Sequence, residues 1–161
     1  MIETLLQSPI GPLLGPLCFL ALWLFVSALL AHFSGWSSLA TEFRATEPTI
    51  GDRFYFVSGS MGARGIPVNY SNCLTLTIGE RGVRLAILLP WRFGSPPLFI
   101  PWAMIESVTA KRFLFWRYVQ IRFRDRRPRL SLHGRAGRCV LETYDQRMAM
   151  QTRLKRSPWT I

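Results

Sequence analysis

The apolar positions of this chain follow two patterns, an unbroken run near the N-terminus and a short-period alternation over the rest. The run covers residues 10–33 (IGPLLGPLCFLALWLFVSALLAHF) and contains no charged side chain. At about 1.5 Å of rise per residue, a helix over these residues would reach about 36 Å, whereas the hydrocarbon core of a bilayer is about 30 Å thick. We therefore predict a transmembrane helix and assign residues 1–36 to a membrane anchor.

An N-terminal apolar run can also be a cleaved signal peptide, which has a basic start, a shorter apolar core and small residues before the cut. Here the only charged side chain before the run is Glu3, and Leu29 and Ala31 make a poor small-x-small pair. These features favour an anchor that is retained. Residues 37–52 then form a polar juxtamembrane connector, in which a brief interfacial helix is expected before Pro48.

From Arg53 onward, apolar and polar residues alternate in short runs, with turn signals about every ten positions. Side chains of a strand point alternately to its two faces, so these runs predict strands with one buried face. About seven short strands are expected. The clearest buried faces are Leu74/Leu76/Ile78, Val83/Leu85/Ile87, Val119/Ile121/Phe123 and Leu130/Leu132.

Past Gly134 the period becomes that of a helix, with Val140, Leu141, Tyr144 and Met148 on one face. Such a helix can plug the open end of a small, strongly bent β-barrel and bury its apolar stripe there. The predicted fold class is therefore one N-terminal transmembrane α-helix plus a mainly-β barrel closed by a C-terminal amphipathic helix. The barrel domain is assigned to residues 53–150, and residues 151–161 are assigned to a basic tail.

The order of these elements resembles the pleckstrin-homology-like (PH-like) folds, including bacterial versions that are tethered by transmembrane segments. The resemblance depends on FIPWAMIESV (99–108), which leads into RYVQIRF (117–123) and then the helix. The segment YSNCLTLTIGERGVRLAILLPWRFGSPPLFIPW (70–102) is also similar to small uncharacterised bacterial single-pass membrane proteins. The resemblance implies a PH-like domain over residues 53–150 and a role in binding, because this fold serves binding far more than catalysis.

Charge is distributed unevenly along the chain. The first 36 residues contain one acidic residue and no Lys or Arg, whereas residues 37–161 contain 20 basic and 8 acidic residues. Cytoplasmic flanks of transmembrane helices are enriched in Lys and Arg. We therefore expect a single-pass protein of the inner membrane, with its N-terminus outside and its C-terminal domain in the cytoplasm.

The basic residues gather toward the C-terminus, where residues 111–161 contain 14 basic and 3 acidic side chains. A predicted hairpin and its turn bring five arginines into one region, which is the candidate site for an anionic lipid or an acidic partner: Arg122, Arg124, Arg126, Arg127 and Arg129. Near an anionic membrane surface each cation contributes about 1 kcal/mol. Three interpretations stay open, namely a solvated basic surface, binding of anionic lipid headgroups, and docking on a larger membrane protein complex as an accessory subunit. Nucleic acid is not an expected partner, because no known nucleic-acid motif is present.

Two further sets of residues suit the membrane. Small residues at helical spacing, which let a second helix approach closely, are candidates for helix–helix contact: Gly11, Gly15, Ser27 and Ala31. Aromatic residues next to the span and in the loop Pro90–Pro97 are candidates for the headgroup boundary: Trp36, Trp91 and Phe93.

The search for catalytic chemistry finds no motif. His32 and His133 stand apart in the sequence, and Cys18, Cys73 and Cys139 show no C-x-x-C spacing. No G-x-S-x-G, Walker A or G-x-G-x-x-G sequence is present. We therefore expect a non-enzymatic protein with no catalytic residue, cofactor or metal.

Overall fold

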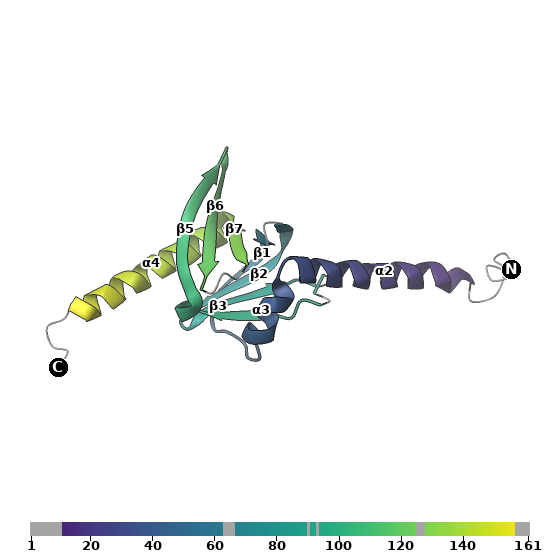
Figure 1. The fold of residues 1–161 in the computed structure, drawn as a ribbon, viewed down its shortest axis with the longest axis horizontal. Coiled ribbons are helices and arrows are strands. Elements are labelled where there is room, and N and C mark those ends of the chain that lie inside the picture. Colours follow the sequence, from purple (N-terminus) through teal and green to yellow (C-terminus); the bar gives the residue numbers. More distant parts are fainter. Residues whose placement is uncertain (1–10, 63–66, 90, 93, 125–127, 157–161) are drawn as a thin grey trace.

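The computed structural model describes residues 11–62, 67–89, 91–92, 94–124 and 128–156 of the chain. Its first element is helix α2 (Gly11–Phe33), which extends to one side of the domain (Figure 1). The segment Leu13–Phe33 has a mean hydropathy of 2.4, and by length and composition it can cross a membrane. In the described part of the chain it is the one helix with this property.

A second, short helix joins α2 to the sheet domain. Helix α3 (Trp36–Phe43) confirms the brief helix expected in the connector, but its apolar residues Trp36 and Leu39 are fully buried in the domain. The indole N–H of Trp36 donates to the carbonyl of Pro96 at 2.8 Å, and its ring lies 5.8 Å from that of Tyr70. The folded domain therefore begins at α3 and not at Arg53.

Seven antiparallel strands form one curled sheet in the order β4-β3-β2-β1-β7-β6-β5. This confirms the expected number of strands. Their bounds are β1 (Gly51–Gly62), β2 (Val68–Gly79), β3 (Gly82–Ile87), β4 (Leu98–Pro101), β5 (Ile105–Phe113), β6 (Trp116–Phe123) and β7 (Arg129–His133). The β5–β6 hairpin projects beyond the rest of the sheet (Figure 1).

The core lies on the concave side of this sheet. Every residue of the four predicted buried faces, from Leu74 in β2 to Leu132 in β7, is at most 6% exposed. The register explains why these faces meet, since Leu76 of β2 is opposite both Phe54 of β1 and Leu85 of β3. The alternation in the sequence therefore identified the inner face of the sheet correctly.

Helix α4 (Gly134–Arg156) covers the concave side and contacts β5, β6, β7 and β1. Its buried residues Ala136 and Val140 pack on the sheet. Farther along, the hydroxyl of Tyr144 donates to the carbonyl of Glu106 in β5 at 3.0 Å. The helix extends to Arg156, so it includes about half of the segment that was assigned to a basic tail.

The short 3-10 helix η1 (Trp102–Met104) joins β4 and β5, which are the two edge strands of the sheet. The indole N–H of Trp102 donates to the carbonyl of Gly79 at 3.0 Å, and the guanidinium of Arg147 in α4 lies 5.3 Å from the Trp102 ring centroid. Such a cation–π contact is favourable. Helix α4 therefore crosses from β7 to the turn between the two sheet ends, as expected of a helix that closes a bent sheet.

Candidate functional site

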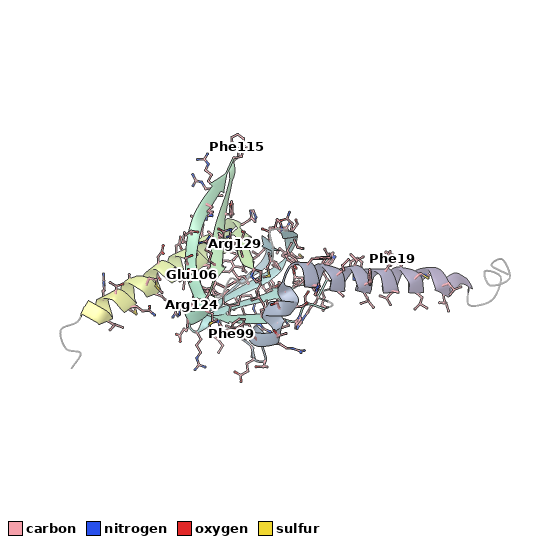
Figure 2. All side chains as sticks on the ribbon, viewed as in Figure 1. Phe19, Phe99, Glu106, Phe115, Arg124 and Arg129 are labelled. Atoms are coloured by element: carbon pink, nitrogen blue, oxygen red, sulfur yellow. The ribbon has the colours of Figure 1, made fainter. Side chains whose placement is uncertain are left out.

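The predicted arginine cluster lies at the end of β6 and the start of β7, beside the edge strand β5. Arg122 and Arg129 are both exposed. Ile121 of β6 pairs with Leu130 of the antiparallel strand β7, so the next residue of β6, Arg122, lies opposite Arg129. Arg124 is also exposed and lies on the side of the domain that faces away from α2 (Figure 2). Arg126 and Arg127 lie outside the described residues. The structure thus brings together three of the five arginines, on a surface that is not next to the apolar helix.

A loop of the domain packs along the side of α2. The ring of Trp91 lies 6.1 Å from that of Trp23, and Gly94 approaches Ala28 so closely that a Cβ on the glycine would lie 3.3 Å from the Ala28 Cα. Trp23 precedes the last residue of α2, Phe33, by ten positions, or about 15 Å along the helix axis. The domain therefore meets α2 along its side as well as at its end.

This contact changes the interpretation of the small residues in α2. Ala31 is buried, and a Cβ on Gly94 would lie 3.8 Å from its side chain, so the chain's own loop occupies the face predicted to receive a second helix. Ser27 is half-buried. At Gly15 an added Cβ would meet nothing within 4 Å, and Gly11 is the first residue of α2.

The three aromatic candidates have different surroundings. Trp36 is 0% exposed, so the prediction that its ring meets the headgroup layer is wrong, and its hydrogen bond to Pro96 explains why a tryptophan is needed inside the domain. Trp91 is 51% exposed and lies beside Trp23, in the middle of the candidate span Leu13–Phe33, so its position at the headgroup boundary stays a prediction. Phe93 lies outside the described residues.

Sequence reasoning missed a pocket on the convex face of β1, β2 and β3. Register places Arg53 opposite Thr77, and Thr77 opposite Arg84, so three adjacent strands contribute side chains to one row. Thr75 and Arg92 also line this pocket, which has a volume of about 360 Å³. Among the described residues that line it, none is acidic. We call this set of three arginines and two threonines the arginine pocket.

One arginine of this pocket is incompletely paired. Arg84 is half-buried, and its Nε is inaccessible to solvent but has no hydrogen-bond partner in the structure. A buried donor without a partner costs about 1–3 kcal/mol, and more when it belongs to a charged group. Arg53 is held at the rim, where its Nη1 donates to the hydroxyl of Tyr55 at 3.3 Å. The pocket therefore contains one arginine donor without a partner, on a guanidinium that could bind an anion.

The thiols of the domain are poor candidates for chemistry. All three cysteines are free, and burial raises the pKa of both the Cys73 and the Cys139 thiol. The carboxylates of Asp52 and Glu142 raise the pKa of Cys139 further. Because the thiolate is the reactive form, these shifts suppress nucleophilic reactivity. In the part of the chain that the structure describes, no group of three or more His, Cys, Asp or Glu residues could hold a metal ion.

Comparison with known proteins does not add to this geometry. No protein-family model matches the chain, and no curated protein is significantly similar to it. The architecture that is shown consists of an N-terminal apolar helix, a curled antiparallel sheet and a C-terminal helix.

Proposed function

We propose that this chain is a non-enzymatic, single-pass inner-membrane protein whose cytoplasmic PH-like domain binds anionic lipid headgroups. The supporting observation is the exposed apolar surface of α2. Large apolar side chains lie all around this helix, and eleven of them are exposed: Leu13, Leu17, Phe19, Leu20, Leu22, Leu24, Phe25, Val26, Leu29, Leu30 and Phe33.

Lipid is the covering that suits this surface best. Fully covering one large apolar side chain is worth about 1.5–3 kcal/mol, so covering eleven partly exposed ones is worth on the order of 10 kcal/mol or more. A helix that packs on one protein partner is apolar on one face, whereas a helix that is apolar all round is surrounded by apolar material. Figure 2 shows Phe19 projecting from a helix that stands clear of the sheet.

The charge distribution supports both the orientation and the ligand. No Lys or Arg precedes α2, whereas Arg44 and Arg53 follow it within about 20 residues, which favours a cytoplasmic domain. An anchored domain meets the lipid surface at high effective concentration, so even modest headgroup affinity suffices for binding. The PH-like identity of the domain is part of the proposal and is supported by seven antiparallel strands followed by a closing helix.

The test uses the full chain, because Trp36 and Leu39 belong to the core and a fragment that begins at residue 45 would lack them. The purified protein in maltoside micelles is mixed with phosphatidylglycerol or phosphatidylcholine, and thermal unfolding is measured. Phosphatidylglycerol should stabilise the protein, by about 2.7 kcal/mol at one hundred times its dissociation constant. High salt should reduce the effect if charge carries it. Equal responses to the two lipids would contradict the proposal.

A second candidate function is that of an accessory subunit of a larger membrane protein complex. The observation that favours it is the tip of the β5–β6 hairpin, where Leu114 and Phe115 are 70% and 84% exposed. This hairpin points away from the axis of α2, so a span by α2 would not bring the tip into lipid (Figures 1 and 2). Exposed apolar patches mark contacts with proteins or membranes, and for a tip that lies outside the lipid the partner would be a protein. Extraction in a mild detergent should then recover the chain in a larger particle, which Leu114→Ser/Phe115→Ser should disrupt.

A further inference from the structure

The arginine pocket has the features of a built anion site. Three arginines line one pocket of about 360 Å³, and none of the described residues that line it is acidic. Bringing three like charges together is unfavourable unless a counter-charge is present. Thr77 is 2% exposed and Thr75 is half-buried, and the two threonines lie on the same face of β2, with Thr77 in the row of Arg53 and Arg84 and Thr75 opposite Ala86. Hydroxyl and guanidinium donors together match the oxygens of a phosphate.

Arg84 is incompletely paired within the protein. Its Nε is buried and unpaired, whereas an arginine that serves the fold forms hydrogen bonds to carbonyls or carboxylates. Arginine is also the residue that binds phosphate with two parallel hydrogen bonds, one of which can come from Nε. Because Arg84 lines the pocket and is half-buried, a phosphate there would supply acceptors to a guanidinium group whose Nε the protein leaves without a partner.

The surroundings of the pocket indicate where such a phosphate comes from. Leu89 lines the pocket and is 72% exposed, and Arg92 directly follows Trp91, whose ring lies against Trp23 of α2. The cationic side of the pocket thus continues into an apolar surface that runs onto the proposed membrane span. This is the order of groups in a phospholipid, in which a charged phosphate is followed by acyl chains.

From this geometry we infer that the arginine pocket binds the phosphate group of an anionic phospholipid. Arg84 is the principal ligand, Arg53 and Arg92 neutralise the charge at the rim, and the acyl chains lie along Leu89 and Trp91. The inference rests on the proposed function and replaces a diffuse basic surface with one site. It assigns lipid recognition to β1–β3 and the loop beside α2, and leaves the arginines of β6 and β7 outside the contact.

The test compares two variants that each remove one positive charge. Arg84→Gln removes the guanidinium of the pocket, and Arg122→Gln removes an exposed one from β6 as the matched control. Full-length protein in maltoside micelles is titrated with short-chain phosphatidylglycerol, and the apparent affinity is taken from the shift in thermal unfolding. Arg84→Gln should weaken binding by about tenfold or more, which is the usual loss for a hydrogen bond to a charged group. Arg122→Gln should change it less than about threefold.

Two further arms identify the ligand and guard against misfolding. Inorganic phosphate and glycerol phosphate should bind in the same Arg84-dependent way but more weakly than the lipid, because they lack acyl chains; equal affinity for phosphate and lipid would overturn the assignment to phospholipid. Without added anion, Arg84→Gln should unfold at the same temperature as the wild type or higher, because a buried unpaired donor is removed. A large fall in that temperature would make Arg84 a structural residue and overturn the inference.

The outcomes also separate this inference from the proposed function. If phosphatidylglycerol and phosphatidylcholine act alike on the wild type, the proposed function fails. A second outcome is that the wild type prefers phosphatidylglycerol, that Arg84→Gln keeps this preference, and that the triple variant Arg122→Gln/Arg124→Gln/Arg129→Gln loses it. The assignment of the lipid to the arginine pocket is then wrong, and the β6–β7 surface is the lipid site.

Discussion

At the scale of single residues, Trp36 shows how the same side chain can suit two environments. A tryptophan just after an apolar helix is typical of the headgroup boundary. In the structure, however, Trp36 is fully buried, donates to the carbonyl of Pro96 and packs on Tyr70. The sequence does not distinguish these cases, because the partners of Trp36 lie 34 and 60 positions away.

The role of Trp36 can be tested by Trp36→Phe, which keeps an aromatic ring and removes the N–H donor. The loss of the hydrogen bond and of ring volume should lower the free energy of unfolding by about 1–3 kcal/mol. Trp91→Phe is the matched control, because Trp91 is 51% exposed and its replacement should cost less than about 0.5 kcal/mol. Unfolding in micelles, followed by near-UV circular dichroism, measures both. Equal stability of the two variants would place Trp36 outside the core.

The arginine pocket is a second feature that the sequence alone does not reveal. In the sequence, Arg84 lies between the apolar Val83 and Leu85, on the polar face of a strand, where arginines are usually solvated. Only the register, which aligns Arg53, Thr77 and Arg84 across three strands, brings the charges together. Arg92 joins them through the packing of a loop. By contrast, the β6–β7 arginines were recognised because they are close in the sequence.

At the scale of elements, the sequence predicts those helices and strands that bury one face, because burial sets the spacing of their apolar residues. The alternation of Leu74, Leu76 and Ile78 identified β2, and the change of period after Gly134 identified α4, because each buries one face. Boundaries were less accurate. Helix α4 extends to Arg156 across residues whose polar side chains give no apolar stripe, and α3 belongs to the domain because of contacts that its own sequence does not encode.

The contact between α2 and the loop is also an element-scale feature that can be tested. A Cβ on Gly94 would lie 3.7 Å from the Cβ of Ala28, within the range of about 3.5–4.5 Å that a disulfide requires. The change Ala28→Cys/Gly94→Cys, in a chain whose native cysteines are replaced by serine, should therefore form an intramolecular disulfide under mild oxidation. Mass spectrometry of the intact protein, before and after alkylation, measures it.

The matched control for this disulfide is Gly15→Cys/Gly94→Cys. Gly15 precedes Ala28 by 13 residues, or about 20 Å along α2, and nothing of the domain lies within 4 Å of its added Cβ. This pair should stay reduced within one chain. If both pairs form the disulfide equally, or if neither does, the loop does not pack on α2 as described. A disulfide restricted to the first pair would support a membrane-proximal loop.

At the scale of the whole molecule, the position of α2 relative to the sheet decides which surfaces can meet lipid. If α2 spans the membrane, the loop with Trp91 and the arginine pocket next to it lie on the membrane side, whereas Arg124 lies on the opposite side (Figure 2). The two basic surfaces can then serve different partners. The pocket suits a phospholipid, and the β6–β7 surface with the hairpin tip is left for a protein.

This arrangement requires the domain to lie in the cytoplasm. Arg44 and Arg53 lie within about 20 residues of the C-terminal end of α2, no Lys or Arg precedes α2, and basic residues close to a span favour the cytoplasmic side. A single cysteine at Glu142, an exposed position of α4, should therefore be protected from a membrane-impermeant maleimide in intact cells and should react after permeabilisation. A single cysteine at Gln7, before α2, should react in both conditions. The reverse pattern would place the domain outside, remove the inner leaflet as the source of its lipid, and contradict the proposed function while leaving the fold intact.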